Sequence, residues 1–182
     1  MLHSSEISSE YQATLRTLLR FAAVMTIVGL LSGVLYQESG KKLDVTKTGV
    51  ALHLEARIHL ALVHGHMLVS AVLLPIAMGA ALVLARMAGG LELSKMSLRF
   101  LTRGYLPCVC AALGLMLYKS YHILLAVRWG NHDLSSIDQN YFGGIKALRH
   151  GVYGLTHIGM ALSLGIFVVA LFRSISLSLI HI

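Results

Sequence analysis

Histidines recur at a spacing of seven residues in two apolar stretches of the chain. His66 lies in the first stretch and follows His59 by seven residues, and His157 lies in the second and follows His150 by seven residues. Seven residues are close to two helical turns, so the two histidines of each pair share one face of a helix. Imidazole nitrogens ligate haem iron, zinc and copper. Because ionisable side chains inside a membrane are costly and mark functional sites, these four residues are the first candidates for chemistry.

His66 and His157 are the inner members of the two pairs, about 10 Å further along their helices than His59 and His150. Two imidazoles that face each other across a helical bundle can ligate one haem iron axially. We therefore predict a haem b site with His66 and His157 as its ligands. His64 lies two residues before His66 and points away from it. It is the alternative ligand or a hydrogen-bonding partner of a neighbouring helix.

A metal ion such as zinc or copper is a second interpretation, because it requires only that a third and a fourth ligand approach. The second-tier candidates for metal ligands are His59, His150 and His122. Two interpretations without a cofactor stay open. Histidines in membrane helices also form structural hydrogen-bond networks, here in a non-catalytic subunit of a larger complex. The other interpretation without a cofactor is a small transporter or proton-conducting protein, although the chain shows no internal repeat.

The composition is that of an integral membrane protein. Of the 182 residues, 56% are apolar and 13% are charged, whereas a soluble domain carries about a quarter charged residues. Four stretches are long enough to cross the hydrocarbon layer, at about 18–36, 58–85, 105–127 and 151–172. They predict an all-α fold in which residues 1–176 form a single four-helix membrane bundle. The net charge of +7 does not indicate nucleic-acid binding, because the basic residues are scattered through the loops.

Local signals describe how these spans are built. Gly29 and Gly33 form a GxxxG pattern in the first span, which favours close packing of helices in lipid. Pro75 predicts a kink in the second span. Residues 50–57 are either an interfacial helix or the protruding start of the second span. Lys119 stands in an apolar part of the third span, where it snorkels to the interface or pairs with an anion such as a haem propionate.

The segments 37–49, 86–103 and 128–149 are expected to be loops. Because loop 86–103 is basic, we expect a cytoplasmic N-terminus in a multi-pass protein of the bacterial cytoplasmic (inner) membrane. Its expected partners are the lipid bilayer and a homo-oligomer or larger membrane complex. The sequence has no nucleophile elbow, phosphate loop or zinc-protease signature, so we expect no independent catalytic activity. Residues 177–182 resemble the translated end of a sequencing adapter, and their histidine is excluded from the site.

Three motifs carry a resemblance to a known family. They are GLLSGVLY at 29–36, HGHML at 64–68 and GVYGLTH at 151–157. Their order and spacing resemble the DUF2871 family of small bacterial membrane proteins, which has no assigned activity. The resemblance implies a four-span fold, and its motifs include His64, His66 and His157 but not the other candidate histidines. The HxH pattern is also similar to histidine motifs of haem–copper oxidase subunit I, which is an analogy only.

Overall fold

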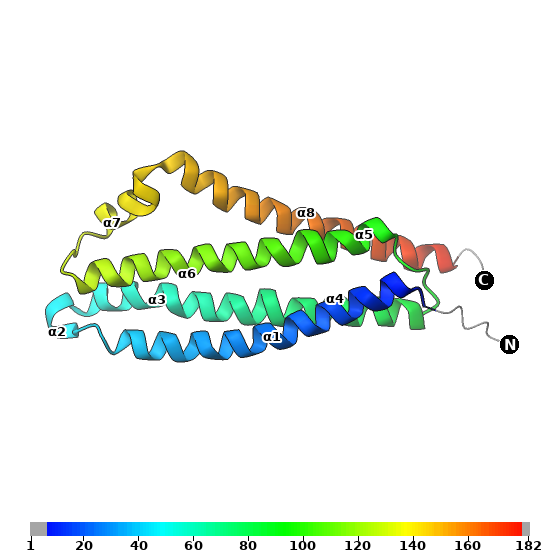
Figure 1. The fold of residues 1–182 in the computed structure, drawn as a ribbon, viewed down its shortest axis with the longest axis horizontal. Helices are drawn as coiled ribbons and strands as arrows, with labels where there is room; N and C mark the ends of the chain where they lie inside the picture. The colour runs from blue at the N-terminus through cyan, green and yellow to red at the C-terminus, as the bar shows by residue number, and fades with distance from the viewer. Residues whose placement is uncertain (1–6, 180–182) are drawn as a thin grey trace.

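Four long helical units make up the protein (Figure 1). The computed structural model describes residues 7–179, and this part of the chain contains helices and turns but no β-strand. The first unit is α1 (Ser9–Gly40), and the fourth is α8 (Lys146–Leu179). The second joins α3 (Val50–His66), the π-helical segment η1 (Met67–Leu73) and α4 (Leu74–Met87). The third joins α5 (Lys95–Arg99), the π-helical segment η2 (Phe100–Tyr105) and α6 (Leu106–Arg128).

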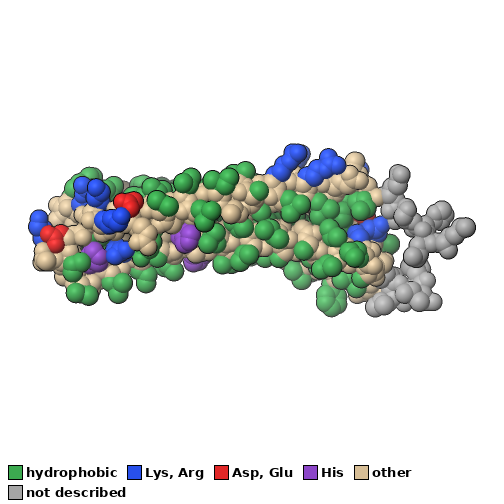
Figure 2. Space-filling view, turned by 90° about the horizontal axis from the view of Figure 1, so that it is seen from below, with side chains coloured by type: hydrophobic (Ala, Val, Ile, Leu, Met, Phe, Trp, Pro, Cys, Tyr) green, Lys and Arg blue, Asp and Glu red, His purple; other side chains and the backbone are tan. Residues whose placement is uncertain are grey.

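All four units are long and apolar enough to cross a membrane. Figure 2 shows hydrophobic side chains over the middle of one face and Lys and Arg side chains at both of its ends. This distribution suits an apolar layer between two polar interfaces. The predicted all-α four-helix membrane bundle is therefore confirmed, and the fold is that of a multi-pass membrane protein.

The second unit is longer than the apolar stretch that predicts it. It begins at Val50, directly after Gly49, whose φ of 76° suits a glycine and ends the preceding turn. Residues 50–57 are therefore the protruding start of the second span and not a separate interfacial helix. A helix continues into the interface because its hydrogen bonds do not require apolar side chains, whereas hydropathy detects only the part inside hydrocarbon.

The three predicted loops also contain helical turns. In the segment 86–103, α5 begins after Ser94, whose side chain accepts a hydrogen bond from the amide of Ser97. Asp133 caps a helix in the third segment in the same way. Caps of this kind satisfy backbone donors that would otherwise be unpaired. The short elements are α2 (Val45–Thr48), α7 (Leu134–Asn140) and the 3₁₀ turn η3 (Tyr141–Gly144).

Each interrupted span contains its π-helical segment just before a proline. Segment η1 ends two residues before Pro75, and η2 ends two residues before Pro107. Proline has no N–H, and its ring crowds the carbonyl group of the preceding turn, so the backbone widens locally. The interruption expected at Pro75 takes this form.

Helices α3 and α8 pack on different sides of α6. Helix α1 packs against α3, η1 and α4, while α3 also packs against α6. Helix α8 packs against α6, η2 and α4. No extensive contact joins α3 to α8 in residues 7–179, and Figure 1 shows α8 diverging from α6 toward α7. In this half of the bundle, α3 and α8 are neighbours of α6 but not of each other.

Small residues bring α1 close to α3 and η1. A Cβ atom at Gly29 would lie 3.0 Å from the side chain of Leu68, and one at Gly33 would lie 3.0 Å from the ring of His64. Both distances are tighter than ordinary van der Waals contact. The GxxxG pattern therefore marks a close helix–helix contact, as small residues do in lipid.

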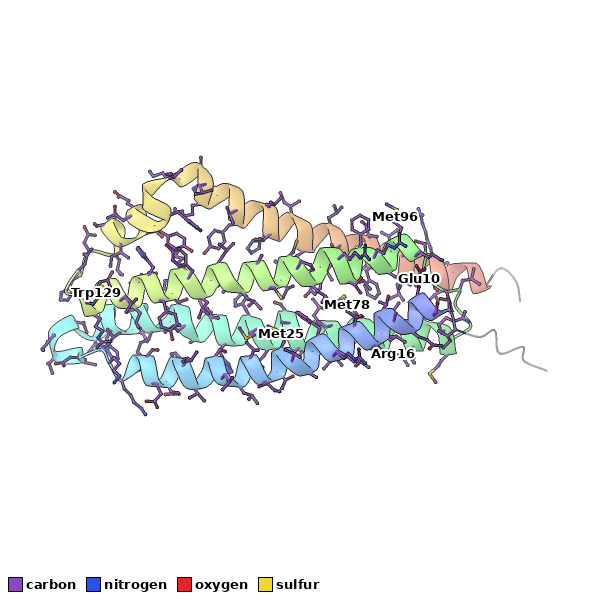
Figure 3. All side chains as sticks on the ribbon, viewed as in Figure 1. Glu10, Arg16, Met25, Met78, Met96 and Trp129 are labelled. Atoms are coloured by element: carbon purple, nitrogen blue, oxygen red, sulfur yellow. The ribbon has the colours of Figure 1, made fainter. Side chains whose placement is uncertain are left out.

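Figure 3 shows how the two ends of the bundle differ. Met25 and Met78 lie among the helices, whereas Glu10 and Met96 lie at the end that carries the termini. Trp129 lies at the opposite end and is 80% exposed. An exposed tryptophan beside a long apolar helix is typical of a membrane interface. The α7 end therefore reaches the polar side of the bilayer.

The sequence end that resembles an adapter begins in the last turn of α8, which extends to Leu179. Residues 180–182, including His181, lie outside the described residues.

Candidate functional site

His66 and His157 show the same local arrangement on two different helices. The Nδ1 atom of His66 lies 2.8 Å from the carbonyl oxygen of Leu62, and that of His157 lies 2.7 Å from the carbonyl oxygen of Tyr153. Because a carbonyl oxygen only accepts, each Nδ1 carries a proton and donates it. An imidazole with its single proton on Nδ1 has its lone pair on Nε2, and the described residues provide no hydrogen-bond partner for either Nε2. Both side chains are exposed.

On α3, His66 leaves the helix on the flank that faces away from α1. Leu60 and Val63 form the buried face of α3, and His64 lies on the flank that contacts α1. His59 lies on the other flank, within electrostatic range of Lys119 and Asp138. His66 follows His59 by seven residues, so the two side chains leave the helix about 20° apart.

On α8, His157 lies on the flank that faces the same groups. His150 lines a cavity of about 250 Å³ together with Lys119, Asp138 and Tyr153. His157 follows His150 by seven residues and therefore shares its side of α8. We call the side of the bundle that carries His59, His66, His150 and His157 the histidine face.

Contacts with α6 fix the depth of His157. Tyr153, one turn before it, has its hydroxyl 3.1 Å from the carbonyl oxygen of Leu115. Gly159, two residues after it, lies against Cys108, whose Sγ would be 2.5 Å from an added Cβ. His157 therefore lies opposite the part of α6 between Cys108 and Leu115.

The depth of His66 follows from contacts on the other side of α6. Leu60, before it, packs in one buried cluster with Ile123. After it, the carbonyl oxygen of Ser70 accepts a hydrogen bond of 2.7 Å from the hydroxyl of Tyr105. Interpolation between these contacts places His66 opposite the same middle part of α6, within about one helical turn of the depth of His157.

His64 belongs to the contact between α1 and α3. Its Nδ1 lies 2.8 Å from the carbonyl oxygen of Gly29 and 3.3 Å from the hydroxyl of Ser32, both on α1. The ring is part-buried there, beside Gly33. Of the two roles open to it in sequence, the structure provides the hydrogen bond to a neighbouring helix, on the flank away from the histidine face.

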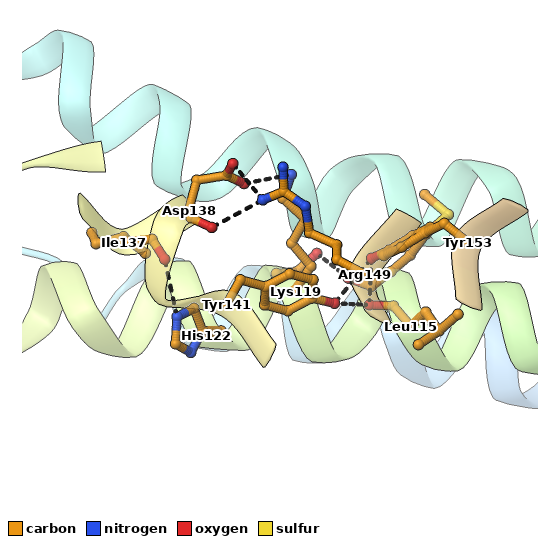
Figure 4. Close-up of polar contacts among 10 residues, drawn as sticks. Leu115, Lys119, His122, Ile137, Asp138, Tyr141, Arg149 and Tyr153 are labelled. Atoms are coloured by element: carbon orange, nitrogen blue, oxygen red, sulfur yellow. Dashed lines mark hydrogen bonds and ion pairs between the residues drawn. The ribbon is translucent and has the colours of Figure 1, made fainter. Parts of the chain in front are cut away.

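A cluster of charges lies at the α7 end of the histidine face (Figure 4). Lys119 Nζ lies 3.2 Å from one carboxylate oxygen of Asp138, and Arg149 Nη1 lies 2.6 Å from the other. Arg149 Nη1 also donates to the main-chain carbonyl of Asp138 at 2.9 Å. We call Lys119, Asp138 and Arg149 the ion cluster. It joins α6, α7 and α8 and contains two cations for one carboxylate.

Asp138 is ionised in this cluster at neutral pH. Burial alone would raise the pKa of its carboxyl group, but hydrogen bonds from Arg149 and Lys119, together with their positive charges, hold the pKa below its ordinary value. The carboxylate is therefore the charged partner of both cations. Because its side chain is 41% exposed, solvent screening reduces the contribution of these pairs to stability.

His122 lies in an aromatic group beside the ion cluster. Its Nε2 is 3.3 Å from the carbonyl oxygen of Ile137, and its ring lies against those of Tyr118 and Tyr141. Burial and a hydrogen bond with Tyr153 raise the pKa of the Tyr141 phenol above its ordinary value. These contacts attach α7 and η3 to α6, so the structure gives His122 a packing environment.

The histidines are not gathered as a set of metal ligands. Within the described residues, no group of three or more His, Cys, Asp or Glu side chains is close enough to hold a metal ion together. His59 and His150 lie at the α7 end of the histidine face, whereas His122 contacts α7. The second-tier residues therefore occupy separate surroundings, and a site with two protein ligands is the simpler use of this face.

Sequence reasoning missed three residues of this region. Asp138, Arg149 and Tyr141 lie in a segment that was expected to be a loop, and no periodic pattern connects them with Lys119. The only signal was the cost of a lysine in an apolar stretch, which indicates a nearby anion. The identity of that anion depends on where α7 folds back.

No protein-family model matches the chain, and no curated protein or solved structure shows significant similarity to it. The fold and the site define its class on their own. It is a multi-pass helical membrane protein with two exposed histidines on one face and an ion cluster at the end of that face.

Proposed function

We propose that the protein binds haem b on the histidine face, with Nε2 of His66 and Nε2 of His157 as the two axial ligands. The observation that carries the proposal is a pair of exposed imidazoles at similar depth, each with its Nδ1–H donated within its own helix. Metal-bound histidines usually donate their second nitrogen to a carbonyl or carboxylate, which fixes the tautomer and orients the ring. Both rings meet this condition before any ligand binds.

An Nε2 atom without a hydrogen-bond donor or a metal ion costs free energy in these surroundings. His157 follows Arg149 by about 12 Å of helix and precedes Arg173 by about 24 Å, so it lies within the hydrocarbon layer. Lipid provides no hydrogen-bond donor for an exposed imidazole nitrogen at this depth. Coordination of iron removes this cost at both positions together, which supports one shared ligand.

The ligand set favours electron transfer among the roles that a haem protein can have. Haem supplies one-electron chemistry when bound, and an iron with two histidine ligands has no open position for oxygen. The hydrogen bond from Nδ1 to a carbonyl oxygen of its own helix fixes the tautomer of each imidazole ring, and both rings lie on the surface of apolar helices. The proposal includes a location in the cytoplasmic membrane with a cytoplasmic N-terminus, as expected from the basic segment 86–103. Membership of the DUF2871 family stays a prediction.

The test is a titration of the purified protein with haem, followed by absorbance. We expect one haem for each chain, with a sharp Soret band and resolved α and β bands after reduction, as six-coordinate low-spin haem gives. His132→Ala is the matched control, because His132 is exposed in the connection after α6, and it is expected to bind haem like the wild type. A folded wild-type protein that gives no such spectrum overturns the proposal.

For His64 we propose a structural role and no role as a haem ligand. His64→Ala is expected to destabilise the protein by about 1–3 kcal/mol, because it removes a part-buried hydrogen bond between α1 and α3. The haem spectrum is expected to stay unchanged, since His64 lies on the other flank of α3. Thermal unfolding in detergent measures the first effect, and the absorbance titration measures the second. A lost spectrum with unchanged stability would make His64 a ligand.

A further inference from the structure

The ion cluster contains more positive than negative charge. Lys119 and Arg149 are part-buried, and their side chains are 34% and 22% exposed. In residues 7–179 both cations contact the single carboxylate of Asp138, which leaves a formal charge of +1. Solvent screens part of this charge because the side chains are partly exposed, and the remaining charge favours a further anion.

The cluster also has unused donors and space. A lysine ammonium has three N–H groups and an arginine guanidinium has five, of which Asp138 engages one nitrogen on each. A cavity of about 250 Å³ lies among Lys119, Asp138 and Arg149, with His150 and Tyr153 on its walls. The way in which Asp138 divides its two oxygens between Lys119 and Arg149 shows that both cations accept carboxylate geometry.

The position of the cluster relates it to the proposed haem. His59 and His150 lie beside it, and they precede His66 and His157 by seven residues, or about 10 Å of helix. Both pairs lie on the histidine face. The cluster therefore lies at the edge of the proposed porphyrin position, on the side of the α7 connection.

We propose that Lys119 and Arg149 bind the propionate carboxylates of haem, so that the propionate edge is directed toward α7. This inference rests on the proposed haem site. Asp138 is the resident carboxylate that holds both cations in place across α6, α7 and α8. The propionates then complete the charge balance that Asp138 alone leaves open.

The experiment compares titrations with haem and with haem dimethyl ester, which has the same ring but no carboxylates. Lys119→Met is expected to lower affinity for haem about 10-fold, the effect of one charge-assisted hydrogen bond, and to leave affinity for the ester unchanged. Arg149→Met is expected to act in the same way. Each variant is compared with the wild type for the same porphyrin, so the difference in how the two porphyrins partition into detergent cancels.

Two further variants make the result specific to charge at this position. Lys119→Arg is expected to restore affinity for haem, because it keeps a donor and a positive charge. Lys146→Met is the matched control, since Lys146 is exposed at the start of α8, and it is expected to change neither affinity. Circular dichroism is the check that each variant is folded.

The outcomes separate this inference from the haem site itself. Low-spin spectra with both porphyrins, together with equal changes or no change in the two affinities of Lys119→Met and Arg149→Met, overturn the propionate site and leave the haem site standing. Low-spin spectra with neither porphyrin overturn both. A loss of affinity for haem alone supports both.

Discussion

His66→Ala and His157→Ala are each expected to convert bound haem from a six-coordinate low-spin form to a five-coordinate high-spin form. Each change removes one of the two proposed axial nitrogens. We expect haem affinity to fall by about 100-fold or more, since even loss of a group that only orients a ligand costs 10-fold to 100-fold. Absorbance titration measures the affinity, and electron paramagnetic resonance of the oxidised protein reports the spin state.

These two variants are favourable tests because neither is expected to unfold the protein. Both side chains are exposed, so alanine leaves no cavity in the core. The carbonyl groups of Leu62 and Tyr153 lose only the imidazole donor and keep their position in a helix. The double variant is expected to show no Soret band of bound haem at all. A low-spin spectrum that survives in His66→Ala or in His157→Ala would exclude that residue as a ligand.

The heptad spacing of the histidines predicted which residues share a helix face, because this follows from the helical period alone. It did not predict which side of α3 faces α1. The sequence favours His66 over His64 as a ligand only because His66 follows another histidine by seven residues, since both are histidines in the same turn of an apolar helix. The contact of His64 with Gly29 distinguishes them, and this contact depends on the register between α1 and α3. Register is a tertiary property that hydropathy does not contain.

The helical fold was predictable for a similar reason. A membrane span must satisfy its own backbone hydrogen bonds, so an apolar stretch of sufficient length implies a helix. The ends of the helices were not predictable from hydropathy, because Ser94 and Asp133 extend helical structure into polar segments by capping. The ion cluster was not predictable for the same reason. Asp138 lies on α7, within one of these polar segments, and it contacts Lys119 and Arg149 from there.

Gly29→Leu and Gly33→Leu are expected to destabilise the protein by about 1–3 kcal/mol each, the usual cost of overpacking a well-packed contact. A Cβ at Gly33 already approaches the His64 ring to 3.0 Å, and one at Gly29 approaches Leu68 equally closely. The further atoms of leucine require α1 to move away from α3. This movement also breaks the hydrogen bond between His64 and the carbonyl oxygen of Gly29. Thermal unfolding of the purified protein in detergent measures the loss.

Gly114→Leu provides the control for a change of glycine to leucine within a membrane helix. Gly114 is exposed on α6, and an added Cβ there would meet nothing within 4 Å. Its variant is expected to unfold at or slightly above the wild-type temperature, because glycine is a poor helix former in an open position. Equal destabilisation by all three substitutions would show that α1 and α3 do not depend on this close approach. Destabilisation confined to Gly29→Leu and Gly33→Leu would locate the effect at the α1–α3 contact, where His64 forms its hydrogen bond.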